Sequence, residues 1–590
     1  MKHHNGESGL KMDGADVVET DLNLALGTPS SHDKTVADNT RGVATDDSFS
    51  NDAIDYPTST RLLMINLSLC ISIFVTALPK RYWLVWKLCV LSFVSLLLPL
   101  SCYKGILDFR TNISGVAYLL TQASLQLLYG KFYTMTPIKC VFVSAIGIFE
   151  LGSLICAVAP NSAALICGRA IAGLGAAGIS SGAVIIITHS VPVQKRPMYT
   201  GLIGAMYGIA SVAGPLLGGA FADKATWRWC FYINLPIGGI AVLLMLFILK
   251  LPHRPLASGL TWRQRIAEFD LVGTICFLLV FLPSIICLLL ALQWGGTTYS
   301  WTSWRIILLL VIFAVLFIIW IIIQYWMGDA ATVPSRLLMK RSIAAAAWFN
   351  FTMGSAFLVL IYYLPIWFQA VKSTSAVVSG IYNLPLILGL VLVSILIGIG
   401  VTVVGYYAPF MIAASAITSI AIGLMTTFTP GSAANKWIGY QAMAGIGIGF
   451  GLQQPLVVVQ TVLPLSDVPI GTALMYFLQV LGGSIFVSVG QNVFTNKLKA
   501  TLLENVPGLD PDIVLSAGAT SFQHSVAPKY LPLVISAYND AITRAFLVAT
   551  LMACLTIMGS LLVEWKNVKA IKKSSENKKS QKITEKADGA

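Results

Sequence analysis

The sequence predicts an all-α protein that crosses a membrane many times. Of its 590 residues, 56% are hydrophobic and only 11% are charged, and the mean hydropathy is +0.77. Soluble domains carry about 25% charged residues. The basic residues, which give a net charge of +13, gather at the ends of apolar runs and in the C-terminal tail. This arrangement is typical of membrane orientation and does not indicate nucleic-acid binding.

Two polar tails flank the apolar part of the chain. Residues 1–60 are rich in Asp, Ser, Thr and Asn and predict a disordered acidic tail without a cleavable signal peptide. Residues 566–590 form a basic tail, expected in the cytosol near anionic lipid. Between the tails, runs long enough for a ~30 Å hydrocarbon core lie at 62–78, 83–100, 115–134, 138–159, 163–188, 198–222, 229–250, 270–293, 304–326, 343–368, 381–404, 407–427, 437–463, 468–493 and 543–563.

Basic residues occur in every second loop and set the predicted orientation. The positive-inside rule places these loops in the cytosol: Lys131 and Lys139; Lys195 and Arg196; Lys250, Arg254, Arg263 and Arg265; Arg336, Lys340 and Arg341. Residues 494–542 then form a long outer loop. Run 83–100 disturbs this alternation, but it is short and contains Lys87. We therefore expect it not to span, which leaves fourteen spans.

Residues 201–219 (GLIGAMYGIASVAGPLLGG) are the most unusual apolar segment. Its glycines and proline would weaken a helix in water; they are Gly201, Gly204, Gly208, Gly214, Pro215, Gly218 and Gly219. In a bilayer, small residues let a neighbouring backbone approach closely, and Gly204 and Gly208 form such a GxxxG pair. We expect this helix to pack tightly and to bend.

Glu150 and Arg169 are charged residues deep within predicted spans, where charge is costly and usually functional. Glu150 lies roughly 15 Å before the turn at Pro160, and Arg169 roughly 12 Å after Asn161, at 1.5 Å per residue. Both should therefore lie near mid-membrane. We hypothesise an ion pair, direct or through water, in which Glu150 titrates against Arg169. The alternative is that Glu150 only anchors Arg169.

Polar side chains in the C-terminal half are candidates for the lining of a substrate cavity. An amphipathic ligand needs apolar contact and a few hydrogen bonds, which could come from Asn350, Gln369, Asn383, Gln453, Gln454 and Gln479. Hydrogen bonding between helices is the alternative for each residue alone. Pro365, Pro385 and Pro455 lie inside predicted spans and could supply hinges.

Signatures of enzymes and metal sites are missing from the sequence. It contains no GxxxxGK[ST] phosphate loop, so ATP is not expected to drive the protein. The six histidines form no HExxH motif, and the ten cysteines contain no CxxC pair. We therefore expect no enzyme, no metal site and no cofactor.

Several segments together resemble the fourteen-span drug:proton antiporter branch of the major facilitator superfamily. Gly201, Gly214, Pro215, Gly218 and Gly219 match the antiporter motif of span five, with Ala210 in place of its second glycine. Residues 165–177 (LICGRAIAGLGAA) are similar to the span-four motif with an embedded arginine, here Arg169. Segments 227–239, 359–370 and 447–455 also resemble this branch, especially the fungal toxin and multidrug efflux pumps.

Two regions depart from the family pattern. In the loop 130–139 (GKFYTMTPIK), Thr134 replaces the usual aspartate, which puts a charge relay there in doubt. Span one usually carries an acid, yet no Asp or Glu lies between Asp55 and Asp108. Residues 79–111 do not resemble the family, and one hypothesis is an intron read as coding sequence.

The resemblance implies two six-helix bundles, within 61–255 and 331–565, joined by two extra membrane helices within 256–330. It implies a substrate site between the bundles, a gating role for the helix of 201–219 and a part for Arg169 in proton coupling. The implied function is secondary active efflux, in exchange for protons, of a small amphipathic toxin, drug or secondary metabolite.

Two alternatives stay open: an uptake permease for a solute such as an iron chelate or nutrient, and a non-transporting membrane sensor. We expect a monomer in the plasma membrane, with the vacuolar membrane as the alternative. Its expected partners are the small-molecule substrate, protons and the lipid bilayer, and not nucleic acid. Asn112, in the sequon 112–114, is a glycosylation candidate on the outer side.

Overall fold

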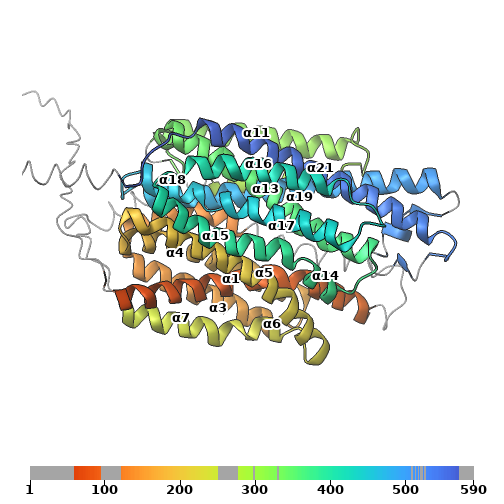
Figure 1. The fold of residues 1–590 in the computed structure, drawn as a ribbon, viewed down its shortest axis with the longest axis horizontal. Helices are drawn as coiled ribbons and strands as arrows, with labels where there is room; N and C mark the ends of the chain where they lie inside the picture. Colours follow the sequence, from red (N-terminus) through yellow and green to blue (C-terminus); the bar gives the residue numbers. More distant parts are fainter. Residues whose placement is uncertain are drawn as a thin grey trace, which may run out of the picture. The chain divides into compact units, whose positions relative to one another are not determined.

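Long apolar helices make up most of the described chain and run along a common direction (Figure 1). The computed structural model describes residues 57, 59–94, 118, 121–249, 277–296, 299–328, 331–506, 509–511, 513–515, 517, 522–523 and 526–569. Most of the predicted N-terminal tail, residues 95–111, Asn112 and residues 570–590 lie outside these ranges. The helices all belong to one unit, residues 53–590.

The N-terminal half is a bundle of helices that begin and end close to the predicted runs. They are α1 (Ser59–Val94), the helical residues 121–135, α3 (Ile138–Ala157), α4 (Ser162–Ser190), α5 (Arg196–Lys224), α6 (Trp229–Tyr232) and α7 (Asn234–Ile248). The Asn161 side chain caps α4 by accepting a hydrogen bond from the Ala164 amide at 2.9 Å. α3 packs against α4 and α7, while α1 packs against α5 and α7.

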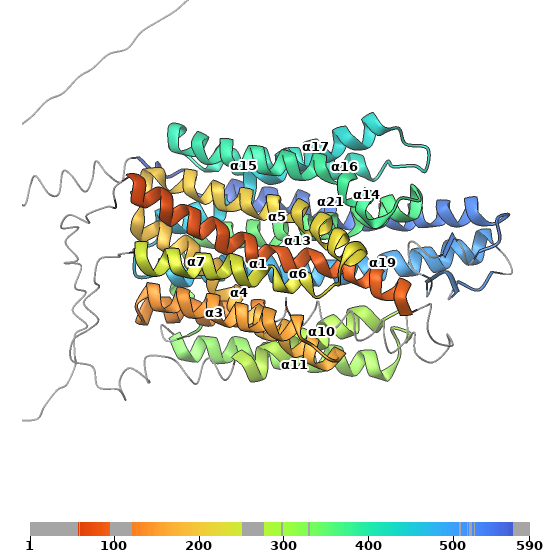
Figure 2. The same ribbon diagram turned by 90° about the horizontal axis from the view of Figure 1, so that it is seen from below.

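A helical hairpin joins the two halves and lies at one edge of the bundle (Figure 2). It consists of η2 (Phe277–Phe281), α10 (Leu282–Trp294) and α11 (Trp304–Met327). The ring of Phe281 lies 5.6 Å from that of Phe477, which ties the hairpin to the C-terminal half. Most of α11 is exposed and strongly apolar, as expected of a helix that faces lipid.

The C-terminal half repeats this construction with two interrupted spans. Its helices are α12 (Ser335–Leu338), α13 (Arg341–Val371), α14 (Ala376–Tyr382), α15 (Leu384–Val404), α16 (Ala408–Met425), α17 (Ala434–Gly451), α18 (Gln454–Val462), α19 (Val468–Asn505) and α21 (Leu531–Leu562). Pro385 and Pro455 lie in the first turns of α15 and α18, where a missing N–H costs nothing. Pro365 lies inside α13.

Eleven described helices are long and apolar enough to cross a membrane, so the predicted fourteen spans remain a prediction. α1 is a single helix of 36 residues. No turn therefore separates run 62–78 from residues 83–94, in keeping with the expectation that 83–100 forms no span of its own.

The predicted outer loop, 494–542, is helical at both ends, and its position on the outer side remains a prediction. α19 continues to Asn505, and α21 begins at Leu531. The apolar run in the sequence ends near Val493. Helix α19 continues beyond it because Leu498 and Leu502, one turn apart, are fully buried.

Contacts between helix ends place the predicted cytosolic loops at one end of the bundle. Lys139 Nζ donates to the Leu246 carbonyl near the end of α7 at 2.6 Å, and Arg341 Nε donates to the Leu562 carbonyl at the end of α21 at 2.9 Å. Cations are favourable there because the last carbonyls of a helix lack partners and carry partial negative charge.

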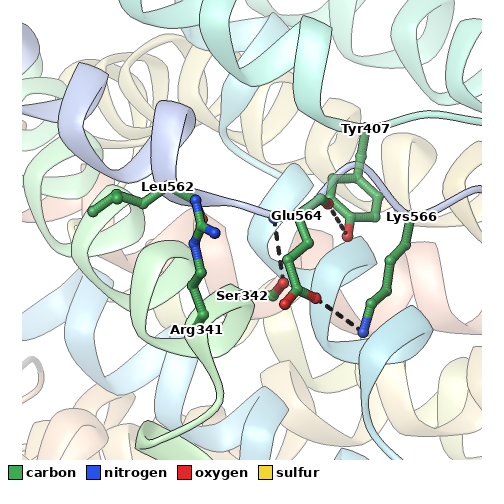
Figure 3. Close-up of polar contacts among 6 residues, drawn as sticks. All are labelled: Arg341, Ser342, Tyr407, Leu562, Glu564 and Lys566. Atoms are coloured by element: carbon green, nitrogen blue, oxygen red, sulfur yellow. Dashed lines mark hydrogen bonds and ion pairs between the residues drawn. The ribbon is translucent and has the colours of Figure 1, made fainter. Parts of the chain in front are cut away.

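Residues 563–569, the C-terminal strap, bind the same end of the bundle (Figure 3). The Tyr407 hydroxyl donates to the Glu564 carbonyl at 2.8 Å, and the Glu564 amide donates to Ser342 Oγ at 3.3 Å. Lys566, with Ser342, holds the pKa of the Glu564 carboxyl below its usual value. The 3.0 Å ion pair of Glu564 with Lys566 therefore persists at neutral pH and is lost as acid protonates the carboxylate.

Tyr407→Phe should lower the melting temperature of the purified protein, because it removes a partly buried hydrogen bond worth about 1 kcal/mol. Tyr406→Phe is the matched control, since Tyr406 is half-buried and contacts the strap through the ring of Trp565. Thermal unfolding in detergent measures both variants. Equal melting temperatures would show that the strap does not stabilise the bundle.

Candidate functional site

The glycine-rich helix α5 packs backbone to backbone against α15 of the other half (Figures 1 and 2). A Cβ on Gly201 would lie 2.5 Å from the Ser394 carbonyl oxygen. A Cβ on Gly398 would lie 2.7 Å from the Pro197 carbonyl oxygen and 3.3 Å from Gly201 Cα. Real side chains do not approach so closely. We call this contact the α5–α15 seam, formed by Pro197, Gly201, Gly208, Val391, Ser394 and Gly398.

The rest of the glycine motif continues the same helix. Gly204 faces the other half, because a Cβ there would lie 2.8 Å from the Gln453 side chain. α5 remains helical through Gly214, Pro215, Gly218 and Gly219. The expected close packing is thus observed at Gly201, Gly204 and Gly208, while the gating role remains a prediction.

Two further contacts join the halves at the predicted cytosolic end. Arg196 is only 4% exposed and donates to the Val191 carbonyl at 3.0 Å and to the Gln460 carbonyl of α18 at 3.3 Å. A Cβ on Gly130 would lie 2.9 Å from Ala473 Cβ of α19. In this conformation, therefore, the two halves are closed against each other at that end.

Thr134, which replaces the aspartate usual in the resembling family, forms a hydrogen bond within its own helix. Its hydroxyl donates to the Gly130 carbonyl at 2.9 Å. Such a bond back to the preceding turn satisfies the hydroxyl locally. The position keeps a polar group here but carries no charge.

Polar groups from both halves lie beside the seam, and we call Ser180, Tyr207, Gln453 and Tyr476 the central polar cluster. Gln453 belongs to it through its contact with Gly204, one turn before Tyr207 on α5. Ser180 Oγ lies 3.2 Å from the Tyr207 hydroxyl, and the phenol of Tyr476 lies near that of Tyr207. Gln453 Oε1 and the Tyr476 hydroxyl are buried and have no hydrogen-bond partner within the described chain. Buried groups of this kind commonly bind water or a ligand.

Gln453 is the one member of the cluster that the sequence predicts as a cavity residue, and the other three are not predicted from it. Tyr207 lies inside the glycine motif, Ser180 lies among the small residues of α4, and Tyr476 is one of many aromatic residues in apolar runs. No local pattern distinguishes these residues, because only the packing of α4, α5 and α19 brings them together.

Two other cavity candidates join helices within the C-terminal half. Asn350 Nδ2 donates to the Met475 carbonyl at 2.6 Å. Gln369 Nε2 and Asn383 Nδ2 both donate to Ser379, at 3.0 Å each. The Asn350 and Gln369 bonds match the alternative of bonding between helices, whereas Asn383 bonds back to the preceding turn of α14.

The remaining candidates are Gln479 and Gln454. Gln479 is half-buried beside Gly354 of α13. Gln454 begins α18, and its buried Oε1 has no partner among the described residues. The two side chains thus take part in none of the bonds between helices described above.

Arg169 and Glu150 point in different directions, so the expected direct ion pair is not found among the described residues. Arg169 Cζ lies 4.6 Å from the centroid of the Tyr118 ring, whose hydroxyl donates to the Thr76 carbonyl of α1 at 3.0 Å. Glu150 instead faces Gly238 of α7, where a Cβ would overlap its Oε1. The spacing predicts a similar depth for the two residues, but depth does not fix the direction in which a helix presents a residue.

Solved structures with a similar fold are transporters. The human organic anion transporter TETRAN aligns with a TM-score of 0.52 at 13% identity, over 84% of this chain and 100% of that one. A proton:xylose symporter, XylE, aligns with a TM-score of 0.53 at 12% identity, over 84% of this chain and 95% of that one. At these identities the likeness shows the fold alone.

Curated relatives are similar over most of their length. An MFS-type efflux pump of Arthroderma benhamiae is 51% identical over 523 residues, 88% of this chain and 94% of the relative. The aspyridones efflux protein of Neocamarosporium betae is 46% identical, over 88% and 89% of the two chains. The efflux pump aflT of Aspergillus parasiticus is 51% identical, over 77% and 88%.

Gly398→Ala should reduce transport several-fold, because overpacking this seam costs about 1–3 kcal/mol. Gly400→Ala is the matched control, since the nearest atom to its Cβ would be in the Phe410 ring at 3.4 Å. Transport per molecule of membrane-inserted protein distinguishes the two. Full activity of Gly398→Ala would rule out a role for the seam.

The sequence model of the Major Facilitator Superfamily matches residues 69–487, which include the helix of 201–219 and Arg169. The fold, the apolar helices and the relatives agree with that match and describe a multi-pass membrane transporter, not an enzyme. This chain therefore belongs to the major facilitator superfamily.

Proposed function

We propose that this protein is an efflux pump that exports a small amphipathic organic compound, a fungal secondary metabolite or toxin. The observation that carries the proposal is the 51% identity to an MFS-type efflux pump over 88% of this chain. Another relative is named for the export of aspyridones. The alignment spans 88% of this chain and 94% of the relative, so it covers most of both proteins.

The central polar cluster supports a substrate site between the halves. It offers a carbonyl oxygen from Gln453 and a hydroxyl from Tyr476, both buried and without a protein partner within the described chain. An amphipathic molecule could bind there through apolar contact and these few hydrogen bonds. Because the cluster includes residues from both halves, substrate binding would be sensitive to their relative movement.

We propose protons as the driving ion and the plasma membrane as the location, with the vacuolar membrane as the alternative. Moving one charge through 100 mV supplies about 2.3 kcal/mol. Arg169 and Glu150 are the charged residues proposed for proton coupling, and they lie at separate places in the structure. Arg169 acts where α4 meets Tyr118, and Glu150 acts between α3 and α7.

Cells that express the protein should retain less rhodamine 6G, an amphipathic fluorescent probe, than cells without it. A protonophore should abolish the difference, since it removes the proton gradient. Flow cytometry of retained dye, repeated with a panel of fungal metabolites, measures both effects. Accumulation instead of depletion would indicate uptake, and no flux across the whole panel would favour the sensor alternative.

Tyr476→Phe should raise the KM for the exported compound about fivefold and leave the maximal rate unchanged, as one lost hydrogen bond is worth about 1 kcal/mol. The melting temperature should not change, because this hydroxyl has no hydrogen-bond partner within the described chain. Tyr538→Phe is the control, since that hydroxyl donates to the Val514 carbonyl at 3.4 Å, away from the cluster. An unchanged KM in Tyr476→Phe would exclude contact between this hydroxyl and substrate.

A further inference from the structure

A buried carboxyl lies between α3 and the peripheral helix α7. The Glu150 side chain fills the space that a Cβ on Gly238 would need. One turn away, the fully buried Asn234 donates its Nδ2 to Ser153 Oγ at 3.3 Å. Both oxygens of Glu150, and Oδ1 of Asn234, are buried without a hydrogen-bond partner among the described residues.

The charged groups on the surrounding helices are engaged elsewhere. Lys139 of α3 donates to the Leu246 carbonyl, and Arg228, which precedes α6, donates to the Ala159 carbonyl at 3.0 Å. Arg169 of α4 lies over Tyr118, and the Cys156 thiol of α3 is directed toward the Leu165 carbonyl. In the described part of α7, no residue is charged.

An ionised carboxylate without a cation or donor is strongly disfavoured inside a bilayer, whereas a neutral carboxylic acid is tolerated. The neutral acid has one O–H to donate. Asn234 Oδ1 is a buried acceptor one helical turn from Gly238, against which the Glu150 carboxyl lies, and this oxygen lacks a donor within the described chain. The surroundings of Glu150 therefore suit its protonated form.

We propose that Glu150, with Ser153 and Asn234, forms a proton-binding site in the α3–α7 interface, separate from Arg169 and from the central polar cluster. This inference rests on the proposed proton-coupled efflux. The Glu150 carboxylate takes a proton from hydronium on the outer side, whose O–H bond breaks and leaves water, and the carboxylic acid later gives the proton to a cytosolic water molecule, which becomes hydronium. No other group changes its covalent state.

The position of α7 suits such an exchange. α7 packs against α1, α3 and α6, and its Ile240 and Leu243 side chains are exposed. A change in the packing of α7 on α3 would admit water to Glu150 without opening the α5–α15 seam. A glutamine would have the same shape and stay neutral, so packing alone does not explain a carboxyl here.

Infrared spectroscopy of the purified full-length protein tests the protonated state without any ligand. The wild type should show a carboxylic acid C=O band at neutral pH that is sensitive to deuterium exchange and missing in Glu150→Gln. Absence of this band from the wild type would overturn the site. The outcome does not depend on whether rhodamine 6G is transported.

Proteoliposomes test the coupling role. An imposed pH gradient should drive rhodamine 6G transport by the wild type, whereas Glu150→Gln should keep downhill transport but lose its response to the gradient. Gradient-driven transport by Glu150→Gln at the wild-type rate would overturn the proposal. No gradient response in the wild type would instead refute proton-coupled efflux, so the two failures are distinguishable.

Variants at two neighbouring glycines distinguish loss of the proton-binding site from general disruption of α7. Gly238→Ala would displace the Glu150 carboxyl and should shift its infrared band and weaken the response to the gradient. Gly239→Ala should do neither, because nothing lies within 4 Å of the position of its Cβ. Equal behaviour of the two variants would contradict a site built around the space at Gly238.

Discussion

The α5–α15 seam is the contact on which the arrangement of the two halves depends. Backbone atoms of Gly201 and Gly398 approach so closely that neither position has room for a Cβ. Such an approach brings the first turns of α5 near α18, where Arg196 reaches the Gln460 carbonyl. It also carries Gly204 against Gln453 and thereby completes the central polar cluster. Small residues therefore decide here where polar residues meet.

Polar groups in the apolar interior have two different environments. Asn350 and Gln369 donate hydrogen bonds to neighbouring helices and help to hold the C-terminal half together. Both carboxyl oxygens of Glu150 and the hydroxyl of Tyr476 are buried without any hydrogen-bond partner among the described residues, whereas Asn350 lacks a partner only at Oδ1. An unsatisfied polar atom is costly in a bilayer and contributes nothing to packing. This contrast distinguishes residues that stabilise the bundle from those proposed to bind a proton or a substrate.

The helices themselves could be predicted well from hydropathy and loop charge. Runs such as 304–326 and 407–427 match α11 and α16 to within two residues. The prediction failed where a helix leaves the apolar region, as α19 does beyond Val493, because burial of Leu498 and Leu502 against other helices continues it. The glycine motif predicted close packing, but it could not name α15 as the partner.

The sequence by itself determined the class of protein and the order of its helices, because length and hydropathy are properties of the chain. Tertiary structure alone decided which way each side chain faces. The rotation of α3 turns Glu150 toward Gly238, while the packing of α4 places Arg169 over Tyr118. Helix rotation is set by contacts between distant segments, and a single sequence does not encode those contacts in any local pattern.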